Sequence, residues 1–186
     1  MPGTLVKQLD FPGGGRFQVV IYDLLYEPVD CIVNAANGGL SHGGGIAAAI
    51  SKAAGPALDK ECDAIIREKG RVPIGGAVVT TAGNLPFKGV IHVVGPRLGS
   101  GDEEGKIVTT LDSAFSLANE KGWTSLSFPG ISSGIFSVPL PVCARAYIRA
   151  VKEFFQRDHG REFRLKTIRL CLLKGALLEA VKKELG

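Results

Sequence analysis

Segments that favour β-strands alternate with segments of helical periodicity along this chain of 186 residues. The strand-like segments are rich in β-branched and aromatic residues and are bounded by Gly or Pro. They are RFQVVIYDL, VDCIVNA, GAVVTTAG, GVIHVVGP, SLSFPG and KTIRLCLL. Helices are expected at residues 45–52, 55–70, around 107–118, from about 139 to 155, and in the closing GALLEAVKKEL. This alternation predicts an α/β sandwich around a largely parallel sheet.

No repeat and no low-complexity linker divides the chain, so we expect residues 1–186 to form a single domain. The longest apolar runs are too short to cross a bilayer, and the first residues lack the pattern of a signal peptide. The four cysteines have no C-x-x-C spacing, and only three histidines accompany them. We therefore expect no metal site, no cofactor and a reducing cytoplasm, or the nucleus if the source is eukaryotic.

The net charge of +4 is unevenly distributed, because the chain from Ala144 onward carries 11 basic and 5 acidic residues. An anionic partner could face this part, but a solvated basic helix face explains the same pattern. We expect a monomer without a nucleic-acid partner and without membrane association.

The first glycine-rich loop runs from Asn34 to Gly45, between a buried strand and an alanine-rich helix. Consecutive glycines let the backbone approach a ligand closely. Gly43, Gly44 and Gly45 lead into the helix start, where free N–H groups and the helix dipole favour an anion. A phosphate group is the ligand that we expect at this loop. No G-K-[ST] follows, so a triphosphate-cleaving P-loop is not expected.

The same loop satisfies the dinucleotide-binding pattern G-x-G-x-x-A, from Gly43 to Ala48. The acidic residues about twenty positions later, Glu61 and Asp63, fall in a predicted helix rather than at a strand end. A Rossmann dehydrogenase is therefore not the preferred interpretation.

The second loop, FPGISSGIFSVPLP, also joins a strand to a helix. Its central N–H groups and hydroxyls could hold another face of the same anion. They belong to Ser132, Ser133, Gly134, Ile135 and Phe136. Either loop alone could be an ordinary tight turn, but two at one sheet edge predict a clamp for a diphosphate. No nucleophile elbow surrounds the serines, so a Ser-His-Asp hydrolase is not expected.

Three polar side chains lie at the ends of predicted strands. Asn34 and Asn37 flank two alanines, and a carboxamide suits sugar hydroxyls because it both donates and accepts, although Asn is also common in turns. Asp23 follows FQVVIY and could accept a hydrogen bond from an exocyclic amine such as that of adenine. A simple strand-end cap is the alternative role for Asp23.

The blocks YDLLYEPVDCIVNAAN, HGGGIAAAI, VIHVVGP and SLSFPGISSGIF resemble, in order and spacing, the signature blocks of macrodomains. The resemblance covers roughly Phe17 to Glu184. It is nearest to macrodomains that bind ADP-ribose, including those attached to ADP-ribosyltransferases and free-standing microbial ones. It implies a three-layer α/β/α fold around a mixed, mostly parallel sheet of about six strands, with ADP-ribose in a cleft at the strand ends.

The resemblance also implies roles for single residues. Asp23 matches the aspartate that holds the adenine amine, beside the N–H of Leu24. Asn37 matches the asparagine that contacts the distal ribose, and His42 matches a histidine found before the glycines in several members. The first phosphate loop would be Gly43, Gly44, Gly45 and Ile46, and the second Ser132, Ser133, Gly134, Ile135 and Phe136, with Phe136 beside the distal ribose.

Two positions depart from the family pattern. Ala47 stands where hydrolases of one branch carry an aspartate, although other active members also have alanine there. The aromatic residue that often stacks on adenine near the last strand is missing, so Leu172 or Leu173 would supply an apolar wall.

The function implied by the resemblance is binding of ADP-ribose, free or protein-linked, and hydrolysis of mono-ADP-ribose from acidic side chains. Asn37 would orient the distal ribose, while a water activated by His42 or by the substrate's own phosphate attacks the anomeric carbon. Alternatives are a reader that binds ADP-ribosylated proteins without cleaving them and an O-acetyl-ADP-ribose deacetylase.

Overall fold

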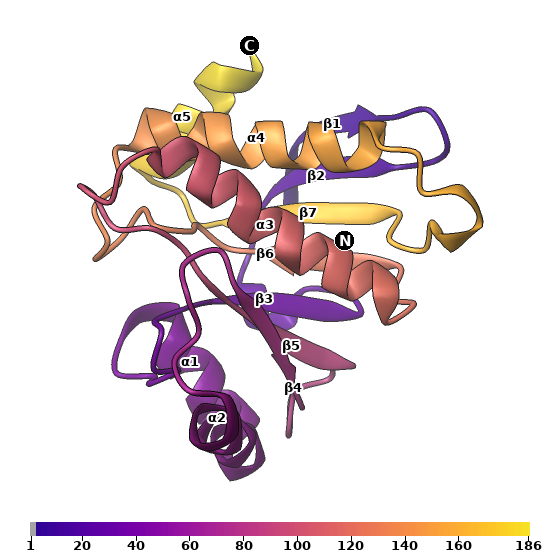
Figure 1. Cartoon of the computed structure of the whole chain (residues 1–186). Coiled ribbons are helices and arrows are strands. Elements are labelled where there is room, and N and C mark those ends of the chain that lie inside the picture. The colour runs from indigo at the N-terminus through magenta and orange to yellow at the C-terminus, as the bar shows by residue number, and fades with distance from the viewer. Residues whose placement is uncertain (1–2) are drawn as a thin grey trace.

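The computed structural model describes residues 3–186, and its central element is a mixed sheet of seven strands (Figure 1). The strand order is β1-β2-β7-β6-β3-β5-β4. The inner strands from β2 to β5 run parallel, whereas the edge strands β1 and β4 are antiparallel to their neighbours. The strands are β1 (Thr4–Asp10), β2 (Arg16–Ile21), β3 (Cys31–Ala36), β4 (Ala77–Thr80), β5 (Gly89–Val94), β6 (Ser125–Phe128) and β7 (Thr167–Leu172). The predicted α/β class with a mixed, mostly parallel sheet is confirmed.

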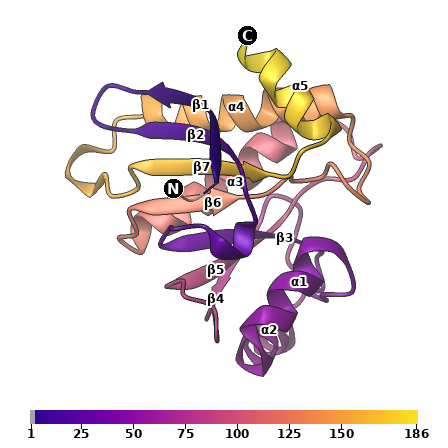
Figure 2. The same ribbon diagram turned by 180° about the vertical axis from the view of Figure 1, so that it is seen from behind.

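Helices cover both faces of the sheet, which gives the three predicted layers. The helices are α1 (Gly45–Ala54), α2 (Pro56–Lys69), α3 (Glu103–Glu120), α4 (Leu140–Gln156) and α5 (Ala176–Leu185), with short 3-10 turns η1 (Leu24–Tyr26) and η2 (Gly160–Glu162). Figure 1 shows α3 and α4 packed across one face, with α5 beside α4. Seen from behind in Figure 2, α1 and α2 lie near the β3–β5–β4 half of the opposite face.

The strand β3 is buried on both faces, as its continuous apolar sequence predicts. Successive side chains alternate between the two faces, so Cys31 and Val33 join the core under α3 and α4. Ile32 joins the smaller core under α1 and α2. All four cysteines are free and buried.

The strand β1 is an addition to the predicted strands and makes the sheet seven-stranded rather than about six-stranded. Its sequence, TLVKQLD, lies at the sheet edge, pairs only with β2, and is half-buried at most. The register shifts between Leu5 and Lys7, which interrupts regular alternation. An exposed edge strand of this kind leaves little hydrophobic pattern in the sequence.

A buried ion pair fixes the segment that follows β2. Arg169 on β7 donates to both carboxylate oxygens of Glu27, at 2.9 and 3.0 Å, and Ser127 on β6 donates to the same carboxylate at 2.6 Å. The Glu27 side chain is fully buried. Because Glu27 is the residue that ends η1, this cluster holds η1 in place at the end of β2.

Within the described residues, no helix is both long and apolar enough to span a membrane.

Candidate functional site

A cleft of about 1020 Å³ lies over the carboxyl ends of the parallel strands. Each of the five parallel strands contributes residues at or just beyond its end. The lining segments are 22–25, 35–37, 41 with 43–47 and 49, 95, 129–136, and 171–173 with 175–177. All of the site residues predicted from the sequence line this cleft except Asn34 and His42.

The first loop brings uncapped helical N–H groups to the cleft. Gly44 is the N-cap of α1 in an extended conformation, and no side chain caps this helix end. A Cβ added at Gly43 or Gly44 would meet no heavy atom within 4 Å, so the loop backbone is open. Leu40, earlier in the loop, has a left-handed φ of 52°. A helix end with exposed N–H groups and no side-chain cap suits an anion.

Asn37 closes a tight turn at the end of β3 and also lines the cleft. Its Nδ2 atom donates to the carbonyl and the hydroxyl oxygens of Ser41, at 3.1 and 2.8 Å, and its Oδ1 atom accepts from the Ser41 N–H at 3.0 Å. The turn role and the ligand role are compatible, because a carboxamide oxygen has a second lone pair. These three bonds fix the orientation in which the carboxamide meets a ligand.

The second loop is held in a strained shape by the core beneath it. The buried hydroxyl of Tyr147 on α4 accepts from the Ile131 N–H at 2.7 Å and donates to the Ile131 carbonyl at 2.5 Å. Burial raises the pKa of Tyr147 well above its usual value. Ser132 and Ser137 have left-handed φ angles of 63° and 61°. The Ser132 hydroxyl is buried and has no partner among residues 3–186.

The opposite end of the cleft combines a carboxylate with apolar side chains. Asp23 Oδ1 accepts from the Leu25 N–H at 2.9 Å and thereby caps η1. Its second oxygen, Oδ2, has no partner within the described part of the chain, so a cap role leaves one oxygen for an amine. Both Leu172 and Leu173 line this end, with exposed fractions of 6% and 73%. Leu173 therefore offers the larger apolar surface.

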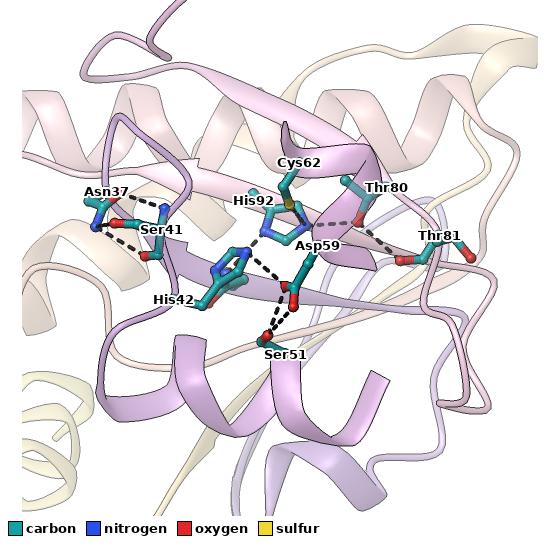
Figure 3. Close-up of polar contacts among 10 residues, drawn as sticks. Asn37, Ser41, His42, Ser51, Asp59, Cys62, Thr80, Thr81 and His92 are labelled. Atoms are coloured by element: carbon teal, nitrogen blue, oxygen red, sulfur yellow. Dashed lines mark hydrogen bonds and ion pairs between the residues drawn. The ribbon is translucent and has the colours of Figure 1, made fainter. Parts of the chain in front are cut away.

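Two of the predicted site residues, His42 and Asn34, do not line the cleft. Figure 3 shows His42 beside Asp59 instead. His42 is turned toward α2, with its Nε2 atom 3.6 Å from Asp59 Oδ1 and its ring 5.8 Å from that of His92. Asn34 is fully buried, and its Nδ2 atom lies 3.0 Å from His92 Nδ1. Asn34 lies within the buried part of β3, and the cleft begins one residue later, with Ala35, Ala36 and Asn37. This geometry does not bring the imidazole of His42 to a bound substrate.

His92 is held as a neutral imidazole below this loop. The Thr80 hydroxyl donates to the Thr81 carbonyl at 3.0 Å, so its oxygen accepts from His92 Nε2 at 2.8 Å. The Nδ1 atom of His92 then accepts from Asn34. Burial, with a smaller effect of His42, lowers the pKa of His92 to about 3. Both ring nitrogens are therefore used by structural hydrogen bonds.

The sequence interpretation missed two contributions to the cleft. Gly95 follows β5, and a Cβ there would lie only 2.3 Å from Ser132 Oγ, so this glycine lets the second loop approach. Gly175 to Leu177 form the start of α5, another helix end without a side-chain cap. Both resemble the two predicted loops, because a glycine follows soon after the end of a strand. Among residues 3–186, no group of three His, Cys, Asp or Glu side chains could hold a metal ion.

The Macro domain family model matches residues 33–147, which is more than half of the chain. The chain is a macrodomain. An O-acetyl-ADP-ribose deacetylase of Escherichia fergusonii is 40% identical to this macrodomain over 144 residues, which are 76% of this chain and 81% of that protein. The human protein mono-ADP-ribosyltransferase PARP14 is 46% identical over 138 residues, 72% of this chain. The macrodomain spans only 8% of the length of that transferase. A Thermotoga maritima protein is 42% identical over 167 residues, which are 89% of this chain but only 27% of that protein.

Solved macrodomains share the fold over nearly its whole length. A structure of the Oceanobacillus iheyensis macrodomain with ADP superimposes with a TM-score of 0.87 at 28% identity, covering 96% of this chain and 94% of that chain. The Trypanosoma brucei macrodomain in complex with ADP-ribose gives a TM-score of 0.80 at 26% identity, covering 91% and 69%.

Proposed function

We propose that this macrodomain binds ADP-ribose in the cleft and hydrolyses mono-ADP-ribose from acidic side chains of modified proteins. The observation that carries the proposal is the convergence of two backbone loops between a carboxylate, Asp23, and a carboxamide, Asn37, in one cleft. The known structures with ADP and ADP-ribose and the relative named as a deacetylase support it.

The chemistry of the lining matches each part of ADP-ribose. Asp23 is the only carboxylate among the described lining residues, and no Lys, Arg or His side chain lines the cleft. A diphosphate would therefore be held by N–H groups of the loops and of the α1 helix end. Asp23 Oδ2 and the Leu24 N–H would receive the adenine, while Asn37 and Phe136 would hold the distal ribose.

The proposed hydrolysis depends on positioning and on charge stabilisation. A water would attack the anomeric carbon of the distal ribose, and the bond to the acceptor carboxylate would break. Because His42 faces Asp59 instead of the cleft, the substrate's own phosphate is the remaining candidate for the base. Asn37 would keep the ribose aligned with the attacking water.

A non-catalytic reader is the second candidate, and the lining of the cleft favours it. Among the described residues that line the Asn37 end, none has a side chain with a usual base role, and Ala47 stands where one branch of hydrolases has an aspartate. The name of the Escherichia fergusonii relative makes O-acetyl-ADP-ribose a further substrate to test.

A reducing compartment such as the cytoplasm suits the four buried free thiols.

Calorimetric titration with ADP-ribose tests the binding part. We expect heat of binding for the wild type and an affinity reduced about tenfold or more in Asp23→Ala, which loses a charge-assisted hydrogen bond. No binding at millimolar ADP-ribose would refute the proposal.

Activity needs a separate measurement on a protein with glutamate-linked ADP-ribose. Loss of the label with wild type, but not with Asn37→Ala, supports the hydrolase. A retained label that co-purifies with the macrodomain supports the reader. Release of acetate from O-acetyl-ADP-ribose alone would point to the deacetylase.

A further inference from the structure

Exposed aliphatic side chains gather on the loops around the Asn37 end of the cleft. Ile74, Leu98 and Ile135 are 46%, 58% and 91% exposed, and they come from three separate loops. Single exposed aliphatic residues are ordinary on a protein surface. Three of them on loops that meet at one end of a cleft are better explained as an interaction surface.

Backbone hydrogen bonds bring these loops together. The Val72 N–H donates to the Gly38 carbonyl, and the Gly75 N–H donates to the Val94 carbonyl, both at 2.8 Å. The loop that carries Ile74 is thereby attached to the ends of β3 and β5. On the other side, the Leu98 N–H donates to the carbonyl of Phe136, the residue after Ile135, at 2.8 Å.

Two exposed arginines lie on the same loops. The Arg97 guanidinium stacks over the Phe136 ring, 4.4 Å from its centroid. The Arg71 guanidinium lies against the turn after Asn37, because a Cβ added at Gly38 would be 3.1 Å from Arg71 Nη2. Within residues 3–186, neither guanidinium has a carboxylate within 4.0 Å.

The carboxylates of Asp102 and Glu103, which follow Arg97, already accept hydrogen bonds from backbone N–H groups. Asp102 caps α3 by accepting from the Gly105 N–H, and Glu103 accepts from the Gly99 N–H at 2.8 Å. The two guanidinium groups are therefore available to carboxylates of another molecule. An arginine is well suited to this because its planar donors match a carboxylate.

We propose that Arg71, Ile74, Arg97, Leu98 and Ile135 form a distal rim that binds the acidic, partly apolar peptide segment to which ADP-ribose is attached. The inference rests on the proposed function, because it needs the distal ribose at Asn37. The guanidinium groups would contact carboxylates beside the modified residue, and the aliphatic side chains would contact its apolar neighbours. A further ADP-ribose unit has phosphates for the arginines but no aliphatic group for the rest of the rim.

The test compares three ligands by calorimetry. They are free ADP-ribose, a short peptide with flanking Glu and Leu that carries ADP-ribose through a non-hydrolysable link, and the same conjugate with Gln and Ser in their place. The measured quantity is the ratio of the Kd for free ADP-ribose to the Kd for each conjugate. This ratio cancels any effect of a variant on the cleft itself.

For the wild type we expect a ratio of about ten for the acidic conjugate, consistent with several exposed contacts of modest strength each, and near one for the neutral conjugate. The ratio for the acidic conjugate should fall to near one in the double variant Arg71→Glu with Ile74→Ser. Lys183→Glu, an equal charge change on α5, should leave it unchanged. Raising the salt concentration should lower the wild-type ratio.

A wild-type ratio near one for both conjugates would overturn the distal rim while leaving ADP-ribose binding intact. Preferential binding of poly-ADP-ribose that is lost in the double variant would also overturn it, in favour of a polymer site. Failure of free ADP-ribose to bind would instead refute the proposed function.

Discussion

The Nε2 atom of His42 lies 3.6 Å from the Oδ1 atom of Asp59, which connects the first glycine-rich loop to helix α2 (Figure 3). Asp59 also accepts from the Ser51 hydroxyl of α1, at 2.8 and 3.0 Å to its two oxygens. One carboxylate therefore joins the loop, α1 and α2. Since His42 precedes the start of α1 at Gly45, this contact helps to hold the segment that offers its N–H groups to an anion.

Replacing Asp59 with Ala should loosen this junction. We expect the free energy of unfolding to fall by about 1 kcal/mol, since a partly exposed charged hydrogen bond is lost. The affinity for ADP-ribose should fall several-fold because the Gly43–Gly45 backbone loses its support. Chemical denaturation and calorimetry measure the two effects. Asp63→Ala, an exposed position on the same helix, is the control and should change neither; equal effects of the two variants would contradict the prediction.

The buried His92 makes stability depend on pH. Its pKa is about 3 in the folded protein, against a usual value of 6.5, so the unfolded chain binds more protons between these pH values. The contribution of His92 is therefore complete above pH 6.5 and is lost as the pH falls toward 3. In this window the free energy of unfolding should fall by roughly 1 kcal/mol per pH unit on account of this group.

Urea denaturation from pH 7 to pH 4 measures this dependence. His92→Gln should show a shallower slope than the wild type, whatever its absolute stability. A slope unaltered by His92→Gln would show that other groups cause the acid sensitivity.

Tyr147→Phe should destabilise the protein through the second loop. The hydroxyl satisfies both the N–H and the carbonyl of Ile131, so its removal leaves two buried backbone groups without a partner. A loss of about 2 kcal/mol or more is expected, together with weaker ADP-ribose binding. Tyr26→Phe removes a hydroxyl from a side chain that is 70% exposed and should cost almost nothing. Similar melting temperatures for the two variants would refute this role of Tyr147.

Two glycine-to-alanine changes should separate binding from stability. At Gly44, φ is −169° and no atom lies within 4 Å of an added Cβ, so Gly44→Ala should keep the melting temperature. The methyl group would enter the space of the diphosphate and lower ADP-ribose affinity about tenfold. Gly95→Ala should reduce both quantities, by roughly 1–3 kcal/mol in stability, because its Cβ meets Ser132. Wild-type affinity in Gly44→Ala would exclude the α1 helix end as the phosphate site.

The sheet was predictable because its central strands carry strong hydrophobic patterns. The segment of β3 reads as continuously apolar, and glycines mark where β3 and β5 end. The loops that follow strand ends in a parallel sheet must meet at one edge, so the predicted glycines of the first loop and the predicted residues of the second share one cleft.

The sequence could not give the orientation of His42 and Asn34. Each lies next to residues that line the cleft, but Asn34 is buried within β3 and the side chain of His42 turns toward α2. The partner of His42, Asp59, lies on a helix later in the chain, and nothing in the spacing of the two residues indicates the contact. The edge strand β1 was not predicted from the sequence, because its residues are too exposed to show a hydrophobic pattern.

The left-handed residues Leu40, Ser132 and Ser137 have a consequence for how quickly a ligand is captured. An L-residue in this conformation costs about 1 kcal/mol or more, and packing around the buried Leu40 and Ser132 offsets that cost. The shape of the cleft is therefore set by the fold itself. Association should proceed in a single step at a rate set by diffusion and orientation, without a slow rearrangement of either loop.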